Sequence, residues 1–207
     1  MKKLVIICVV LASVSIYSEA CSCLRIPHPQ VQFCNADFVI EARVLRRVET
    51  GTSPFQEVYY TVSIHRNYRR ETRRRPATRY PTRYRSPFER IYTAHSSASC
   101  GVPFQIGRDY IIAGQIRNDR MNAHFCGWNL PTSALTQFQR NALRNGYYRN
   151  NCGCSIRDCT RNNRSGCRVS RQRECKITTN SPCYRTRSAC VSVRGRCRWT
   201  SSPCVVL

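Results

Sequence analysis

The residues with the most distinctive chemistry are two cysteines separated by one serine, Cys21-Ser22-Cys23. They directly follow a segment typical of a cleaved signal peptide, so cleavage after Ala20 gives Cys21 a free α-amino group. An N-terminal amine and the carbonyl of the same residue form a five-membered N,O chelate, which Zn²⁺ accepts at an open coordination position. Because the reference pKa of this amine is roughly 7.7–8.0, part of it is neutral and able to bind metal near pH 7.

The signal segment, residues 1–20, has the three expected parts. Lys2 and Lys3 supply positive charge, residues 4–14 are apolar, and 18–20 carry small residues at the −3 and −1 positions of the cleavage site. An uncleaved membrane anchor is the alternative, but the apolar run is shorter than a bilayer of roughly 30 Å requires, as is every later segment. We therefore expect a secreted protein without a membrane span, located in the extracellular space or extracellular matrix.

Cysteine usage supports the same compartment. The chain has 15 cysteines, and removal of Cys8 with the signal segment leaves an even number, which predicts a complete set of disulfides. Cys21 and Cys23 could also form a thiolate pair for a metal, but oxidised sulfurs are not thiolate ligands. The backbone amine and carbonyl of Cys21, rather than its sulfur, are the candidate zinc ligands.

The chain is strongly basic, with 34 basic and 11 acidic side chains and a net charge of +23. Removal of Lys2, Lys3 and Glu19 leaves 32 basic and 10 acidic side chains, a net charge of +22, and almost all the positive charge is arginine. Arginine binds planar oxyanions such as sulfate in a bidentate manner. A charge of this size attracts polyanions in general, but we expect no specific nucleic-acid partner.

Arginines concentrate between residues 69 and 90, a stretch with almost no aliphatic side chains. Such a stretch cannot bury enough apolar area to offset the entropy of ordering, so we expect a loop or an extended ribbon. One interpretation is a solvated loop that keeps the protein soluble. The other, which we favour, is retention on sulfated glycosaminoglycans by counterion release. The candidate polyanion-binding residues are Arg69, Arg70, Arg73, Arg74, Arg75, Arg79, Arg83 and Arg85.

The fold is expected to be mainly β with small helices, an α+β class. Apolar residues alternate over 37–45 and 58–64, which predicts two strands of a long hairpin, and further strands are expected at 91–94, 110–116 and 123–126. Asn118-Asp119 is turn chemistry between the last two. Five or six strands with one or two helices favour a small closed antiparallel barrel, five-stranded, of the oligonucleotide/oligosaccharide-binding type. A jelly roll or sandwich stays open on periodicity alone.

One helix is expected after Pro131, because Leu135, Phe138 and Ala142 have helical spacing. Thr132 or Ser133 is its predicted N-cap, and Gly146 is predicted to end it. Residues 26–30 are expected to be extended because they contain two prolines.

Cysteine density divides the rest of the chain into a domain at 21–152 and a small disulfide-rich domain at 153–207. The second is poor in aliphatic residues and must depend on its disulfides for stability. Its only strand-like segments are 191–193 and 198–199. Asn163 starts an Asn-X-Ser sequon and is the expected glycosylation site.

Enzymatic chemistry is not indicated. The chain has no HExxH, no GxSxG, no phosphate-binding glycine loop and no acidic pair at useful spacing. Its four histidines, at 28, 65, 95 and 124, are scattered, although a ribonuclease-like convergence of two of them stays open on the sequence alone. We expect no enzyme activity and no cofactor of the protein's own.

Several motifs together carry a family resemblance. The chain is similar to the tissue inhibitors of metalloproteinases over essentially its whole mature length, and most strongly up to Cys159. The resemblance implies a netrin-like barrel followed by a small disulfide-rich domain, in a monomeric protein. The motifs are Cys21-Ser22-Cys23, Pro27-His28-Pro29-Gln30, Phe33-Cys34-Asn35-Ala36-Asp37, the run TAHSSASCGV at 93–102, Tyr110-Ile111-Ile112-Ala113-Gly114 and Cys152-Gly153-Cys154.

The resemblance also implies a mechanism and a set of site residues. Cys21 would chelate the catalytic zinc of a matrix metalloproteinase or related zinc protease, and Ser22 would enter its specificity pocket. Cys23, Leu24 and Arg25 would follow along the primed subsites, with Asn35 beside them. The zinc belongs to the target enzyme. A loop made of Ser96, Ser97, Ala98 and Ser99 would lie next to this segment.

Disulfide pairing is implied by the resemblance alone, since even six cysteines allow fifteen pairings. Cys183 and Cys204 have no counterpart in the usual pattern, and we predict that they pair with each other. The expected pairs are Cys21–Cys100, Cys23–Cys126, Cys34–Cys152, Cys154–Cys197, Cys159–Cys167, Cys175–Cys190 and Cys183–Cys204.

Two alternatives from other classes stay open. One is a netrin-like module that binds heparin or matrix without inhibiting a protease, and the other is a basic, disulfide-rich defence protein. Neither explains why the first mature residue is Cys21 or why a small residue, Ser22, follows it.

Overall fold

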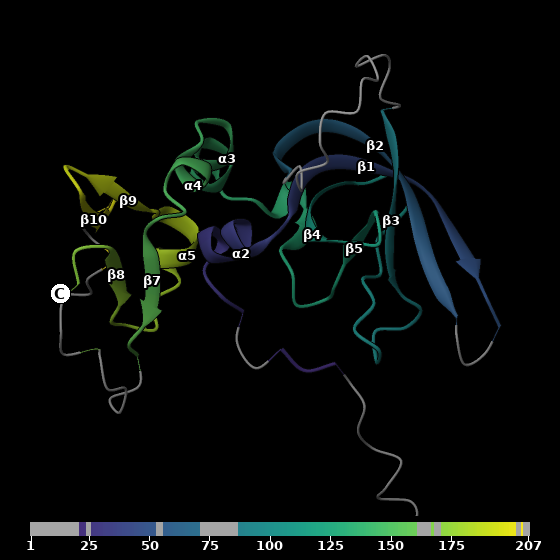
Figure 1. Cartoon of the computed structure of the whole chain (residues 1–207), viewed down its shortest axis with the longest axis horizontal. Helices are drawn as coiled ribbons and strands as arrows, with labels where there is room; N and C mark the ends of the chain where they lie inside the picture. Colours follow the sequence, from purple (N-terminus) through teal and green to yellow (C-terminus); the bar gives the residue numbers. More distant parts are fainter. Residues whose placement is uncertain are drawn as a thin grey trace, which may run out of the picture.

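The computed structural model of the protein describes residues 21–23, 26–52, 56–70, 87–160, 167, 171–201 and 204, with only the backbone of Arg70. Figure 1 shows a β-barrel at one end, a group of short strands at the other, and helix α2 (Pro29–Asn35) between them. The expected class, mainly β with small helices, is confirmed.

The barrel is a sheet in the order β1-β2-β3-β5-β4-β6, which pairing between β1 and β4 closes into a five-stranded ring. The expectation that the barrel is antiparallel is wrong for one strand pair, because β3 and β5 are parallel, and it is confirmed for all the others. Closure leaves no unpaired edge within the ring. The strands are β1 (Phe38–Thr50), β2 (Glu57–Arg70), β3 (Phe88–Ala94), β4 (Asp109–Arg117), β5 (Arg120–Ala123) and β6 (Asn129–Pro131).

The β1–β2 hairpin supplies much of the barrel core. Val44 lies opposite Val62 in the register, and the inward side chains of both strands are buried, as the alternating pattern predicts, except Ile64, which is partly buried. Tyr60, Phe104 and Tyr110 extend this core with edge-to-face ring contacts. The interior of the barrel is therefore a packed hydrophobic core, and the rigid strands around it fix the ends of the connecting loops.

The predicted strand at 123–126 is displaced toward the N-terminus. Asn118 and Asp119 both have positive φ angles, 51° and 60°, and make so tight a turn that β5 starts at Arg120. After Ala123 the chain leaves the sheet, because the His124 carbonyl and ring accept the N–H groups of Gly127 and Cys126. Residues 124–126 are a loop rather than a strand.

The expectation that residues 26–30 are extended is wrong from residue 29 onward, where α2 begins. Pro29 is tolerated at the first helical position because that position has no intrahelical N–H partner to lose. His28 is the N-cap, and its Nδ1 accepts the N–H of Gln30 at 3.1 Å. His28 as N-cap followed by Pro29 marks the start of a helix. The prediction missed it because two prolines in five residues indicated an extended segment.

The predicted helix after Pro131 forms, but later than expected. Residues Thr132–Ala134 make a short 3₁₀ turn, η1, and α3 (Gln137–Arg144) begins only after Thr136. Thr136 and Gln139 form a capping box, each side chain bonding the other's backbone N–H. Gly146 follows the end of α3 with φ 72°, as predicted, and leads into α4 (Tyr147–Asn150).

The C-terminal half consists of short elements joined by disulfides. The hairpin of β9 and β10 confirms the strand-like segments at 191–193 and 198–199. The other elements were missed, because they are too short to produce a periodic pattern. All the elements of the C-terminal half, in chain order, are β7 (Ser155–Asp158), β8 (Glu174–Ile177), α5 (Cys183–Arg187), β9 (Cys190–Val193) and β10 (Arg196–Trp199).

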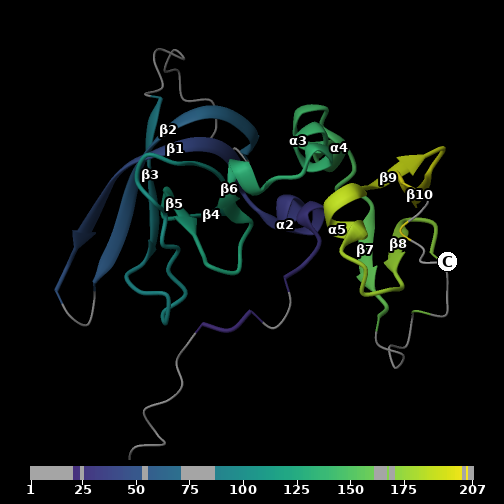
Figure 2. The same ribbon diagram turned by 180° about the vertical axis from the view of Figure 1, so that it is seen from behind.

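Helix α2 fastens the two halves together, as Figure 2 shows from behind. The buried Gln30 side chain donates to the carbonyls of Cys190 and Asn151, at 2.8 and 3.0 Å, and accepts the Cys190 N–H at 2.8 Å. The buried His28 ring makes a 2.7 Å hydrogen bond through Nε2 to the Tyr184 carbonyl. These two side chains satisfy backbone groups that burial would otherwise leave unpaired.

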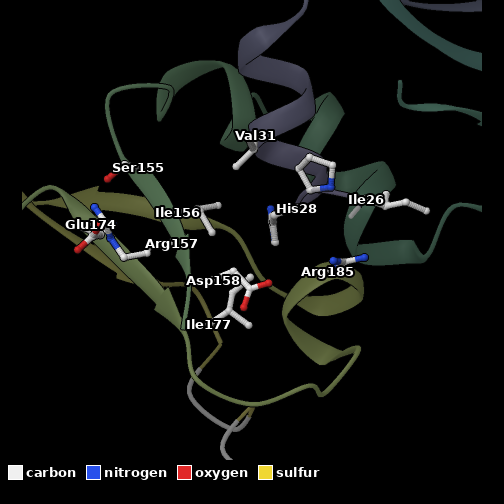
Figure 3. A pocket seen from close by; sticks show the side chains of 11 residues that line it. Ile26, His28, Val31, Ser155, Ile156, Arg157, Asp158, Glu174, Ile177 and Arg185 are labelled. Carbon is white, nitrogen blue, oxygen red and sulfur yellow. Dashed lines mark hydrogen bonds and ion pairs between the residues drawn. The ribbon is translucent and has the colours of Figure 1, made fainter. Parts of the chain in front are cut away.

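His28 also borders a hollow of about 430 Å³ between the start of α2 and strands β7 and β8. Figure 3 shows its ring between Ile156 and Arg185, and Asp158 lies below the ring in this view. Because Nδ1 accepts one hydrogen bond and Nε2 donates another, the neutral ring fits this site. Burial, with a smaller contribution from Arg185, lowers the pKa of His28 from 6.5 to about 4.

This shift predicts a pH-dependent stability. Between pH 6.5 and about 4 the unfolded chain binds a proton at His28 and the folded chain does not, so stability falls as pH falls through this window. The expected loss is about 3 kcal/mol. Urea unfolding of the disulfide-intact protein at pH 7.5 and pH 4.5 measures it. His28→Gln should lack this component, whereas the exposed control His65→Gln should keep it. Equal pH dependence in wild type and His28→Gln would contradict this prediction.

Candidate functional site

The segment at Cys21 is held to the barrel by two neighbouring disulfides. Cys21 pairs with Cys100 and Cys23 pairs with Cys126, with Cα–Cα distances of 4.9 and 5.6 Å. The Cys21 Sγ lies 4.0 Å from the Cys126 Sγ, so the two bridges are in contact. Ser22 lies between them and is exposed. A three-residue segment is thus fixed at both ends with its middle side chain free in solvent.

A loop of small residues follows β3 and ends at Cys100, the anchor of Cys21. Ser96 and Ser99 hold the loop closed, because their hydroxyl oxygens are 3.0 Å apart and each accepts the other's backbone N–H. The Gly101 N–H adds a 2.8 Å bond to the Ser96 carbonyl. Ser97 and Ala98 stay exposed at the tip, so the loop offers small side chains on a rigid backbone.

Gly101 is required by the close approach of the chain at the end of this loop. A Cβ atom there would lie 2.1 Å from the Ala94 carbonyl oxygen and 2.8 Å from that of Ser96. The next residue is also fixed, since the Val102 N–H donates to Thr93 Oγ1 at 2.9 Å. The loop is therefore positioned by backbone contacts that tolerate no side chain at residue 101.

We call the surface formed by residues 21–23 and the loop 96–99 the Cys21 edge. Two residues at this edge were not predicted as site residues. Phe125 has 47% of its surface exposed, and its N–H donates to the Cys100 carbonyl at 2.9 Å. A ring nitrogen of His124 lies within 4.8 Å of the sulfurs of Cys21 and Cys100. Their position next to Cys126 in the sequence becomes informative only when the Cys23–Cys126 disulfide is known. An exposed aromatic ring on a fixed backbone is the kind of group that anchors protein interfaces.

Asn35, the last residue of α2, is also exposed at this edge. Its carbonyl accepts a hydrogen bond from Gln115 Nε2 at 2.7 Å. A hollow of about 280 Å³ has Asn35, Cys126 and Trp128 in its wall. The structure thus brings Asn35 close to the Cys23–Cys126 bridge.

The described part of this edge contains no free thiol that could bind a metal. Cys21, Cys23 and Cys126 have sulfurs close enough to share an ion, but all three are oxidised. A half-cystine sulfur lacks the charge of a thiolate ligand. The donors at Cys21 that suit Zn²⁺ are therefore the backbone carbonyl and, after cleavage at Ala20, the amine.

The residues that the structure describes form seven disulfides. Six are the pairs that the resemblance implies, and the seventh is the Cys183–Cys204 pair, which was predicted separately because the family pattern has no counterpart for it. Three tie the N-terminal segment and α2 to the barrel and to Cys152, and four stabilise the C-terminal half. The Cys183–Cys204 pair is among these four. They are Cys21–Cys100, Cys23–Cys126, Cys34–Cys152, Cys154–Cys197, Cys159–Cys167, Cys175–Cys190 and Cys183–Cys204.

Other predicted site residues lie elsewhere. Leu24, Arg25 and the sequon residue Asn163 are outside the described residues, as are the arginines from 73 to 85 and the side chain of Arg70. Arg69 takes part in the fold itself, because its Nε donates to the Ala36 carbonyl at 2.7 Å.

The four histidines have separate surroundings. His28 is in the joint between the halves, His65 faces Asp109 at 3.3 Å, and His95 faces Glu49 at 3.6 Å. His124 is beside Cys21. No two of them share a partner among the described residues, so the ribonuclease-like convergence left open by the sequence is not found there.

Three features together are typical of one class of protein. They are the closed barrel, the disulfide-rich half and the Cys21 segment with its two disulfides. The chain matches the family model "Tissue inhibitor of metalloproteinase" over residues 19–201. The chain belongs to this family. The described residues contain no helix long and apolar enough to cross a membrane.

The chain is also similar to proteins named as metalloproteinase inhibitors. Metalloproteinase inhibitor 3 of Gallus gallus is 34% identical over 143 residues, 69% of this chain and 61% of that protein. Metalloproteinase inhibitor 3 of Scyliorhinus torazame is 32% identical, with the same coverage. Metalloproteinase inhibitor 2 of Homo sapiens is 32% identical over 151 residues, 69% of this chain and 62% of that protein. The chain thus spans about three fifths of the length of these relatives.

Proposed function

We propose that the protein is a secreted inhibitor of zinc metalloproteinases of the matrix type. The observation that carries this proposal is the double anchoring of an exposed three-residue segment, Cys21 to Cys23, beside the rigid loop 96–99. Family membership and the printed names of the relatives support it. The protein then acts by occupying an active site rather than by catalysing a reaction, and it needs no cofactor of its own.

In this proposal the mature N-terminus chelates the catalytic zinc of the target. The Cys21 amine and carbonyl take the open coordination position, where the enzyme otherwise activates its attacking water. Ser22 enters the specificity pocket, and Cys23, Leu24 and Arg25 continue along the primed subsites. The loop 96–99, Asn35 and the exposed Phe125 ring contact the rim of the cleft. Residues 21–152 form the inhibitory domain and residues 153–207 a second domain.

The disulfides explain how so short a segment binds tightly. A nanomolar complex requires about 12 kcal/mol, and a flexible peptide loses much of its gross interaction energy when it is ordered. Here Cys21 and Cys23 are each bonded to the barrel, so most of this ordering occurs during folding. The hydrogen bonds within the 96–99 loop likewise order the backbone of that loop during folding.

Inhibition by the secreted protein tests the proposal. The protein should be expressed with its signal segment, sequenced from its N-terminus, and titrated against the catalytic domain of a matrix metalloproteinase. We expect the sequence to begin at Cys21 and the titration to reach full inhibition at one inhibitor per enzyme. A mature chain that begins at Cys21 and leaves a panel of such enzymes fully active would contradict the proposal.

Substitution of Ser22 provides a second prediction. Ser22→Arg introduces a long charged side chain where a small one is proposed to enter the specificity pocket, so the inhibition constant should rise at least tenfold. Folding should be unaffected, because Ser22 is exposed. Ser133→Arg, on the exposed η1 turn, is the matched control and should inhibit like wild type. Equal inhibition by the Ser22 and Ser133 variants would count against the assigned role of Ser22.

A further inference from the structure

Five arginines gather around β10 at the C-terminal end of the fold, and we call this surface the β10 basic edge. All five are exposed. Among the residues that the structure describes, no carboxylate forms an ion pair with any of them. They are Arg171, Arg173, Arg194, Arg196 and Arg198.

The backbone holds these arginines in a fixed arrangement. Arg196 and Arg198 alternate with Cys197 and Trp199, which are bonded into the interior by the Cys154–Cys197 disulfide and by Trp199 Nε1 to the Lys176 carbonyl at 3.0 Å. Residues two apart on a strand have Cα atoms about 6.6–6.8 Å apart on the same face. The Cys197 N–H donates to the Gln172 carbonyl at 2.7 Å, which brings the segment 171–173 alongside β10.

The charge of this region is not offset by acidic residues. Residues 153–207 contain twelve basic and two acidic side chains. Glu174 is buried and paired with Arg157. Asp158 accepts two hydrogen bonds from Thr160. The β10 basic edge therefore has a positive potential, because its guanidinium groups are exposed and no carboxylate of the described residues pairs with them.

We propose that the β10 basic edge binds a linear sulfated polysaccharide. Guanidinium groups bind planar or tetrahedral oxyanions in bidentate fashion, and an arginine row along a strand matches a chain with anions at intervals. Seven disulfides indicate an oxidising, extracellular compartment, where sulfated polysaccharides are the abundant linear polyanions. This site is distinct from the stretch between residues 69 and 90, which the sequence predicted for polyanions.

The location leaves the Cys21 edge free. Figures 1 and 2 both show β9 and β10 at one end of the molecule and the tips of β1 and β2 at the other. A polysaccharide on the β10 basic edge therefore does not cover the barrel. The inference does not depend on the proposed inhibitory function, and a test of one leaves the other unaffected.

Calorimetric titration of the full secreted protein with a heparin octasaccharide tests this site. Arg196→Ser/Arg198→Ser should weaken binding at least tenfold and lower the slope of log K against log salt by about 1.4–1.8, since each lost contact contributes roughly 0.7–0.9. The matched control, Arg108→Ser/Arg117→Ser, removes the same charge from exposed positions on the barrel. It should weaken binding less than twofold. Both variants should unfold at the wild-type temperature and inhibit like wild type.

Three results would overturn the assignment. Equal weakening in both double variants would attribute binding to net charge alone. Loss of binding only in Arg73→Ser/Arg74→Ser/Arg75→Ser would move the site to the other arginine stretch. Equal affinity for a single-stranded oligonucleotide of the same charge, at the same salt concentration, would exclude preference for a sulfated polysaccharide.

Discussion

An additional alanine before Cys21 is expected to weaken inhibition of a matrix metalloproteinase by at least 1,000-fold. The extension converts the α-amine of Cys21 into an amide, which is not basic and cannot complete the N,O chelate. It also adds atoms where the zinc is proposed to lie. A 1,000-fold change corresponds to about 4 kcal/mol, a plausible share of the roughly 12 kcal/mol in a nanomolar complex. Inhibition constants of the two proteins against one catalytic domain measure the effect.

The control for this prediction is the fold of the extended protein. Its two disulfides at Cys21 and Cys23 use side-chain sulfurs that the extension does not touch. Thermal unfolding and heparin binding should therefore match the wild type. Removal of the alanine with an aminopeptidase should restore inhibition. Undiminished inhibition by the extended protein would exclude chelation through the amine.

Gly101→Ala is expected to destabilise the fold by about 3 kcal/mol or more and to weaken inhibition at least 100-fold. The new Cβ would lie 2.1 Å from the Ala94 carbonyl oxygen, a backbone atom of β3 that cannot move without distorting the strand. Relief of this overlap shifts the neighbouring Cys100, the disulfide partner of Cys21. The loss of inhibition follows from misplacement of the N-terminus. Urea unfolding and inhibition assays on the same preparation measure the two effects.

Gly153→Ala is the matched control, because a Cβ at residue 153 meets no atom within 4 Å. It should change stability by less than about 1 kcal/mol and leave inhibition unchanged. If Gly101→Ala were as stable and as inhibitory as Gly153→Ala, the proposed dependence of the Cys21 edge on the loop 96–99 would be wrong.

The barrel was predictable because its strands are half-buried and alternate. Val44, Val62 and Ile112 point inward from strands whose polar residues point outward, and this produces the period of two that the sequence displays. Closure of the ring, and the parallel pairing of β3 with β5, leave no comparable signal because they depend on contacts between distant segments. Helix α2 was missed for a local reason, since Pro29 reads as a helix breaker but occupies the one position where it favours a helix.

The candidate site was only partly predictable. Cys21 could be identified as a candidate from the signal peptide and the chelate chemistry, and Ser22 from the family resemblance, before any fold was known. Phe125 and His124 could not, because an exposed aromatic residue has no periodic signature and gains its place only when Cys126 meets Cys23. Gln30 belongs to a recognisable motif, but its part in the fold has no sequence signal, because its two hydrogen bonds to the backbone of Cys190 join segments 160 residues apart.

The central claim is that the Cys21 amine and carbonyl coordinate the zinc of the target enzyme. The most direct measurement replaces that zinc with Co²⁺, whose visible absorption reports its coordination number, and records the spectrum as the inhibitor is added. Wild-type protein should lower the absorption intensity at one equivalent, because the amine and the carbonyl replace one water and raise the coordination number of the metal from four to five. Alanine-extended protein should leave the spectrum unchanged. A spectrum that does not change although wild-type protein fully inhibits the Co²⁺ enzyme would contradict zinc chelation by Cys21.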